Sequence, residues 1–268
     1  MEEANTLQEG SQGGNSSWES ECCLSAILDL GELLLMHGAE VCRVEDTVTR
    51  LCAAYGFVRS DVFSITSSII VTAFRADGSG LTQTRRIKER GTDLGKVAQI
   101  NALSRKICAE PLPVQELNRE IACLRERKKA LSVLEPWMYL LISASLSIFF
   151  GGNWQDGLAA ALSGLVLYGM IYWSSFLKLN SIVQNMICCA VTGVAVLLLV
   201  RLGLGVHADK IMIGNIMLVI PGIQLTNSLR DMINGDMISG LLNMCEALLK
   251  AVAVAMGFAA VVILGGAL

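Results

Sequence analysis

The chain has 268 residues, of which 53% are hydrophobic and only 17% charged, and its mean hydropathy of +0.54 lies outside the usual balance of a soluble globular protein. The formal net charge of -3 and the shortness of the Arg-rich stretches do not indicate the extended basic surface that nucleic-acid binding needs, so we expect no nucleic-acid partner. Of the 45 charged residues, 34 precede Glu135, which predicts a first part in water and a second part in lipid.

The nine cysteines contain no CxxC pair, and the chain has only two histidines, His37 and His207. These residues form no spaced cluster of the kind that holds zinc and no disulfide framework. The sequence also lacks a glycine-rich phosphate loop. We therefore expect neither a metal nor a bound cofactor.

Residues 1–19 are rich in Glu, Asn, Gly, Ser and Gln and lack the apolar core of a signal peptide, so we predict a disordered tail. From Cys22 onward, leucines and isoleucines recur at helical spacing up to His37, where Gly38 is suited to end the helix. A second helix is predicted over 40–55, and Gly56 ends it in the same way.

Residues 57–75 are rich in β-branched and aromatic side chains that favour strands, residues 76–80 form a turn, and 81–87 is the returning strand. Thr92 or Asp93 can cap a helix that continues to about Ala109. Pro111 and Pro113 separate it from a last helix. Residues 20–130 are thus predicted to form a small α/β domain.

Five apolar stretches follow, at about 132–151, 155–176, 181–203, 210–229 and 237–266. Each is near or above the ~20 residues that cross a bilayer. The predicted fold class is therefore an α-helical membrane protein, in which a transmembrane domain of about five helices over 131–268 follows the α/β domain.

The orientation is predicted from the run Arg125–Lys129, which has four basic residues in five and immediately precedes the first apolar stretch. The loop after that stretch has no Lys or Arg. By the positive-inside rule, the N-terminus and the α/β domain are cytoplasmic and the C-terminus lies outside. We expect a multi-pass protein of the cytoplasmic (inner) membrane.

Pro221-Gly222 falls within the fourth apolar stretch, and polar residues follow it. Proline removes a backbone donor and clashes with the preceding turn, which predicts a broken helix, and many transporters place a substrate site beside such a break. The alternative is a structural kink followed by an ordinary surface loop. The candidate pathway residues here are Pro221, Gly222, Thr226, Asn227, Arg230, Asp231 and Asp236.

The last apolar stretch contains Glu246 and Lys250, which are spaced i and i+4 on one helix face. At this spacing the two side chains can pair, which lowers the cost of placing charges in a membrane. The pair is a second candidate for the transport pathway, and a purely structural pair is the alternative.

A third candidate is the corner between the first two predicted helices, which gathers ionisable side chains. These residues can perform acid–base chemistry or hold a weak metal site. In the alternative interpretation Gly38 is a cap and the acids stabilise the first turn of the next helix through its dipole. The residues of this corner are His37, Gly38, Glu40, Arg43, Glu45 and Asp46.

Two segments together carry a resemblance to a known family: His37–Thr47 (HGAEVCRVEDT), and Pro221–Asp231 (PGIQLTNSLRD) with Gly235-Asp236 and Ser239-Gly240. From about Cys22 onward the chain resembles the N-terminal part of the threonine/serine exporter family. Fused members of that family carry further spans on the same chain, so the resemblance implies a split system in which a separate small membrane subunit supplies the other helices. It also implies an amino-acid substrate, threonine or serine, with a dicarboxylate such as succinate as the alternative.

As an exporter subunit, the chain is expected to be no enzyme and to form an oligomer in the lipid bilayer. Thr226 and Asn227 would then offer neutral hydrogen bonds to the substrate, Arg230 would pair with a carboxylate, and Asp231 or Asp236 would carry the coupling charge. Two other classes stay open: a membrane-anchored hydrolase that uses the His37–Asp46 region, and a sensor or scaffold that the spans only anchor.

Overall fold

The computed structural model of the chain describes residues 2–88, 90–126, 133–177 and 179–265. Most of the basic run at 125–129 and the beginning of the first apolar stretch lie outside the described residues. The chain divides into two compact units, here called the first and the second unit. The first consists of Met1–Lys128 with Thr226–Asn243, and the second of Lys129–Leu225 with Met244–Leu268. A segment from the apolar half of the sequence is therefore part of the first unit.

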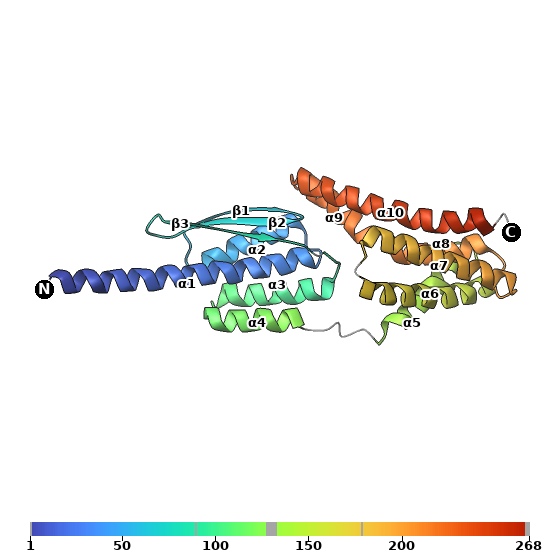
Figure 1. Cartoon of the computed structure of the whole chain (residues 1–268), viewed down its shortest axis with the longest axis horizontal. Coiled ribbons are helices and arrows are strands. Elements are labelled where there is room, and N and C mark those ends of the chain that lie inside the picture. Colours follow the sequence, from blue (N-terminus) through green and yellow to red (C-terminus); the bar gives the residue numbers. More distant parts are fainter. Residues whose placement is uncertain (1, 89, 127–132, 178, 266–268) are drawn as a thin grey trace. The chain divides into compact units, whose positions relative to one another are not determined.

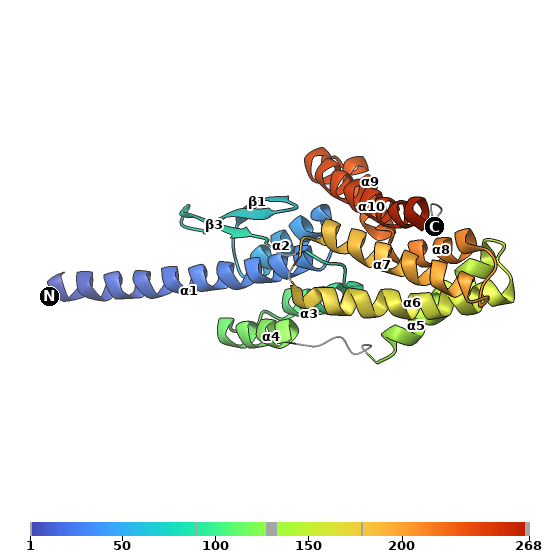
Figure 2. The ribbon, with the colours of Figure 1, turned by 45° about the vertical axis from the view of Figure 1, so that its right-hand side comes forward.

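The first unit is an α/β structure in three layers, in which α1 and α2 lie between an antiparallel sheet and the pair α3 and α4 (Figure 1; Figure 2). The sheet has the order β1-β2-β3. Apart from the segment Thr226–Asn243, the elements of the first unit are α1 (Glu2–Met36), α2 (Val41–Ala54), β1 (Arg59–Ile65), β2 (Ser68–Phe74), β3 (Gly80–Arg86), α3 (Leu94–Ala109) and α4 (Val114–Glu126).

The predicted helix ends of this unit are confirmed. Helix α1 ends at Met36 and is followed by Gly38 with φ +87°, and α2 is followed by Gly56 with φ +85°, the left-handed conformation that glycine adopts without strain. The Asp93 side chain caps α3 by accepting a hydrogen bond from the Lys96 N–H at 3.0 Å. Helix α1 also takes in residues 2–19, for which the sequence predicts a disordered tail.

The segment 57–75 forms two strands, because the chain reverses within it. Ile65 pairs with Ser68, so Thr66 and Ser67 alone make the turn between β1 and β2. Neither is one of the residues that mark a two-residue hairpin turn in a sequence, such as glycine or asparagine. The turn at 76–80 between β2 and β3 is present as predicted, with Gly78 at φ +82°.

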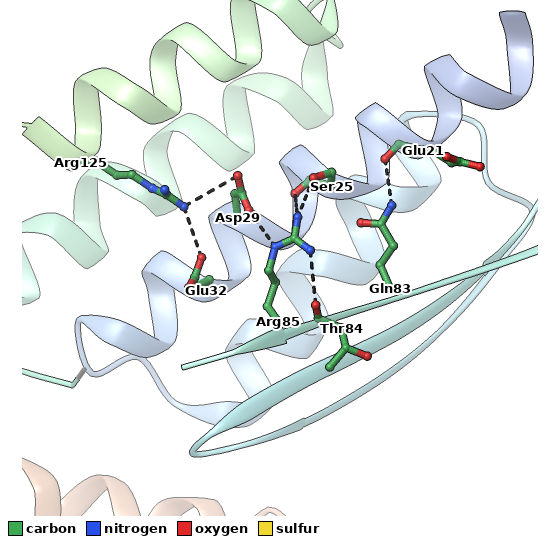
Figure 3. Close-up of polar contacts among 8 residues, drawn as sticks. All are labelled: Glu21, Ser25, Asp29, Glu32, Gln83, Thr84, Arg85 and Arg125. Carbon is green, nitrogen blue, oxygen red and sulfur yellow. Dashed lines mark hydrogen bonds and ion pairs between the residues drawn. The ribbon is translucent and has the colours of Figure 1, made fainter. Parts of the chain in front are cut away.

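Helix α1 is fixed to the sheet and to α4 by polar side chains on one of its faces (Figure 3). Arg85 of β3 pairs with Asp29 at 3.0 Å and donates to the Ser25 hydroxyl at 2.6 Å. Arg125 of α4 reaches Glu32 at 3.3 Å. Other side chains of α1, among them Leu24, Ile27 and Leu28, are buried in the core of the unit.

The second unit is helical, and it continues through the break into α9. Its elements are α5 (Glu135–Phe149), α6 (Trp154–Ser174), the short 3-10 helix η1 (Ser175–Leu177), α7 (Ser181–Arg201), α8 (Ala208–Val219), the start of α9 (Gly222–Ile233) and most of α10 (Met237–Gly265). Helices α6, α7 and α10 are each long and apolar enough to cross a membrane, and α8 with α9 makes a fourth candidate, bent by 50°.

Helix length and composition identify fewer candidate spans than the predicted five. Among the described residues there are three candidate spans, or four if the bent pair is one span. The first predicted stretch forms α5, whose 15 residues reach only ~22 Å at ~1.5 Å per residue. A bilayer core is ~30 Å thick, so helix length alone does not make α5 a span.

Small residues let the helices of the second unit approach closely. A Cβ atom on Gly214 of α8 would lie 2.6 Å from the carbonyl oxygen of Ser143 on α5, and one on Gly257 of α10 would lie 2.5 Å from that of Met186 on α7. Both distances are too short for any larger residue. Such contacts are typical of membrane helices, in which close packing takes the place of the hydrophobic effect between helices.

A buried polar network links α5, α6 and α8. The Asn215 side chain donates to the Ser163 hydroxyl at 2.8 Å and accepts from the Ser143 hydroxyl at 3.0 Å, and Ser143 also lies 2.9 Å from the Ala160 carbonyl. All three side chains are fully buried. The network provides each polar group with a partner in a setting without water, and no sequence pattern predicted it.

Candidate functional site

The predicted break at Pro221-Gly222 is present. Helix α8 ends at Val219, Ile220 is extended with φ -60° and ψ 128°, and α9 begins at Gly222. The proline ring and its missing N–H prevent α8 from continuing, and the 50° bend follows.

The predicted pair in the last helix also forms. Lys250 Nζ lies 2.7 Å from Glu246 Oε1 on α10, and it donates to the side-chain oxygen of Gln224 at 3.1 Å. Gln224 is in the first turn of α9, immediately after the break. The lysine thus connects the start of α9 to α10, and its place in a transport pathway stays a prediction.

Further along α9, polar side chains meet the corner between α1 and α2, within the first unit. The Asn227 amide donates to the Gly38 carbonyl at 3.2 Å, and Arg230 forms an ion pair with Glu40. These partners are 189 and 190 positions apart in the sequence. The two segments that carry the family resemblance therefore contact each other.

The contact of α9 with the α1–α2 corner is called the junction below. At this junction Asp231 is buried, with only 1% of its surface exposed. Among the described residues, neither of its carboxylate oxygens has a hydrogen-bond partner of ordinary geometry, although the Val41 N–H and the Asn243 side chain lie close. The negative charges of Asp236 and Glu40 are near enough to repel it. Burial without firm donors and beside like charges makes the ionised form of a carboxyl group costly in free energy.

The turn between α9 and α10 places Asp236 beside this group. Gly235 has φ +101°, and the Asp236 N–H donates to the Asp231 carbonyl at 2.9 Å. The carbonyl of Asp236 accepts the N–H of Gly240 at 2.9 Å and so starts α10. The helix is thus interrupted at Gly235, and Asp231 and Asp236 lie near each other instead of on opposite helix faces.

On the α2 side, Glu45 has a structural partner. Its carboxylate accepts hydrogen bonds from the Ser64 N–H at 2.6 Å and the Ser64 hydroxyl at 3.0 Å, which fixes α2 to β1. Burial raises the pKa of Glu45, the two bonds from Ser64 oppose this shift, and the charge of Asp236 adds to it. Glu45 and Asp236 thus belong to one cluster of carboxylates.

The electrostatics of the corner disfavour Cys42 as a nucleophile. Partial desolvation raises the pKa of the Cys42 thiol, and the carboxylates of Asp236, Glu45, Asp46 and Asp231 raise it further. Catalytic cysteines need positive surroundings that lower the pKa. Among the described residues, no three His, Cys, Asp or Glu side chains are grouped to hold a metal ion.

Most of the candidates from the sequence thus fall into two groups. Gly38, Glu40 and Glu45 meet Asn227, Arg230, Asp231 and Asp236 in the first unit, and Thr226 is on the same stretch of α9. Pro221, Gly222, Glu246 and Lys250 belong to the second unit. The backbone carbonyl of His37 accepts a hydrogen bond from the Asp93 N–H at 3.0 Å. Arg43 of α2 lines a separate cleft.

Asp156 is a buried charge that the sequence analysis missed. Its carboxylate accepts hydrogen bonds from the backbone N–H groups of Asn153, Val206 and His207 at 2.7–2.9 Å and lies 2.8 Å from His207 Nδ1. It joins the loop before α6 to the loop before α8. A lone acid in an apolar region is the signal that could have identified it.

Comparison with known proteins identifies the family of the chain. Residues 25–265 match the model of the ThrE family, described as "Putative threonine/serine exporter". The chain is 26% identical to the "Probable succinate transporter subunit YjjP" of Klebsiella aerogenes over 84% of its own length and 86% of that protein, and 27% identical to the Escherichia coli protein of the same name over 86% and 90%.

A third relative is the "Probable threonine/serine exporter" of Mycobacterium tuberculosis, which is 23% identical over 91% of this chain. The match covers only 46% of that longer protein. No solved structure matches the chain. Because the family model covers nearly all of the sequence, the chain belongs to the ThrE family of threonine/serine exporters.

Proposed function

We propose that this chain is one subunit of a secondary exporter for small dicarboxylates of the succinate class, and that it works with a second membrane subunit. Two relatives that match it over most of both lengths are named succinate transporter subunits. The threonine/serine relative is more distant and much longer, so threonine or serine, the first expectation from the sequence, becomes the second candidate.

The observation that carries an exporter mechanism is the environment of Asp231. A carboxyl group that is buried, lacks firm hydrogen bonds and follows a break in a membrane helix can couple substrate movement to a proton. Loss of the proton would add a third negative charge to those of Asp236 and Glu40, and the resulting repulsion favours a rearrangement of this turn.

The ion pair of Arg230 offers a way to recognise a carboxylate. The sequence predicted that Arg230 binds the substrate directly, whereas here Glu40 occupies its guanidinium. We propose that a substrate carboxylate takes the place of Glu40. A guanidinium holds either carboxylate in the same geometry, so the exchange opens the junction without leaving the arginine unpaired.

We further propose five crossings of the membrane, with the α/β domain in the cytoplasm. Because Asn227 and Arg230 contact the α1–α2 corner, the chain must cross an even number of times between α4 and α9. Either α5, α6, α7 and the bent pair all cross, or only α6 and α7 do. The buried bond of Ser143 to α6 and the close contact with Gly214 of α8 favour α5 as a member of the bundle.

This topology is tested by labelling from outside the cell. In the five-span arrangement the loop between α5 and α6 is external, so Asn153→Cys is expected to react with a membrane-impermeant maleimide in intact cells, above the background of the native cysteines. A reporter fused after Leu268 is expected to be active only in a form that works outside. Labelling of residue 153 only in lysed cells would instead favour three spans, and a cytoplasmic reporter would contradict both arrangements.

The substrate is tested by counterflow in proteoliposomes. Vesicles that contain this chain and the second subunit are expected to exchange internal succinate for labelled external succinate, and labelled threonine or serine much more slowly. Vesicles with this chain alone are expected to exchange nothing. Exchange of threonine but not succinate would move the substrate class to amino acids, and exchange by the chain alone would contradict a split system.

A further inference from the structure

A second polar site lies between α2 and α3 in the first unit. It is a cleft of about 320 Å³, large enough for a small metabolite. Arg43 and Arg50 of α2 line one wall, and Asn101, Arg105 and Cys108 of α3 line the other. The mechanism proposed above uses none of these side chains.

The cleft has an excess of positive charge. Three arginines line it against a single acid, Asp46, which pairs with Arg50 at 2.9 Å. Both side chains of that pair are more than half exposed, and such pairs are weak. In the part of the chain that the structure describes, no carboxylate pairs with Arg43 or Arg105.

The spacing of these residues directs them into the same space. Arg43 and Arg50 are seven positions apart, so they lie on one face of α2 with ~10 Å between their positions along the axis. Asn101, Arg105 and Cys108 follow the same rule on α3. A ligand between the two helices would therefore meet guanidinium groups from both walls.

The hydroxyl groups of the cleft are already engaged. Thr47 donates to the Arg43 carbonyl at 2.8 Å, and Ser104 donates to the Asn101 carbonyl at 3.0 Å. The donors that remain for a ligand are thus the arginine groups and the Asn101 amide. A guanidinium presents a planar fork of N–H donors that matches carboxylate and phosphate oxygens.

We propose that this cleft binds a small anion with at least two negative charges on carboxylate or phosphate groups. Arg43 and Arg105 would hold it from opposite walls, and displacement of Asp46 would add Arg50. None of the residues that line the cleft takes part in the Asp231 junction, so a bound anion would act on the α/β structure as an effector and not as the transported molecule.

The test uses Cys108, whose thiol is exposed at the cleft and within the electrostatic influence of Arg50 and Asp46. The full-length chain, purified in detergent at constant ionic strength, is labelled with a maleimide while succinate or inorganic phosphate is titrated. A bound anion covers the thiol and disfavours its thiolate, so labelling of Cys108 is expected to slow saturably. Exposed Cys123 on α4, labelled in the same sample, reports any general effect.

Arg105→Gln is expected to raise the half-saturating anion concentration about tenfold or more, since it removes charge-assisted hydrogen bonds. The matched control is Arg119→Gln, which neutralises an exposed arginine on α4 and is expected to change nothing. The anion that saturates at the lower concentration identifies carboxylate or phosphate as the preferred group. The proposal is overturned if neither anion protects Cys108, if the neutral analogue succinamide protects it equally, or if Arg105→Gln behaves like wild type.

Discussion

Replacing Asp231 with asparagine is expected to abolish export, by about a hundredfold or more, while the protein still inserts and folds. Asparagine has nearly the same size, and its neutral side chain removes the charge that burial and the neighbouring carboxylates penalise. The fold is therefore expected to be as stable as wild type or more so. Only the ability to exchange a proton is lost, and with it the coupling.

The measurement is the rate of substrate efflux divided by the amount of inserted protein, with the second subunit present. Asp209→Asn is the matched control, because Asp209 is an exposed carboxylate in the first turn of α8. This substitution is expected to leave the export rate unchanged. Asp236→Asn tests the other acid of the turn and is expected to weaken folding as well as export. If both Asp231→Asn and Asp236→Asn transport normally, this turn is a surface loop with no part in the mechanism.

Reversing the charge of Arg230 is expected to have the second largest effect. Arg230→Glu places a fourth carboxylate beside Glu40, Asp231 and Asp236 and is expected to reduce export about tenfold or more. The double variant Glu40→Arg/Arg230→Glu restores the ion pair with the positive and negative side chains exchanged. It is expected to recover assembly of the junction, measured as thermal stability, but not the affinity for a dicarboxylate.

The exposed pair Arg59–Asp61 of β1 provides the control for charge reversal in the same unit. Arg59→Glu is expected to cost little, because both side chains are more than half exposed and such pairs contribute at most about 1 kcal/mol. A double variant as unstable as Arg230→Glu alone would refute the role of the Glu40 pair in holding the junction.

Features that depend on the local chemistry of one residue could be predicted from the sequence. Gly38 and Gly56 end helices through a left-handed conformation, Asp93 caps α3, and Pro221 breaks the fourth apolar segment. The turn at Thr66-Ser67 lacks such a residue. It is fixed by the pairing of whole strands, which single residues do not reveal.

The composition of the site depends on contacts that carry no local signal. Glu40 and Arg230 were both candidates, but nothing in their own segments indicates that they pair across 190 positions. Arg230 was therefore assigned to the substrate. Glu45 was a candidate acid–base group because of its type, whereas its place opposite Ser64 on β1 gives it a structural role.

Because Thr226–Asn243 belongs to the first unit, the order of synthesis and the order of folding differ. The ribosome completes the α/β core roughly 100 residues before this segment emerges, a delay of roughly 5–20 s at ~5–20 residues per second. During that time Gly38 and Glu40 lack their partners on α9. The segment between α4 and α9 must be synthesised first, and only then can α9 contact the α1–α2 corner. A chain whose membrane helices do not insert correctly is therefore left with an incomplete first unit.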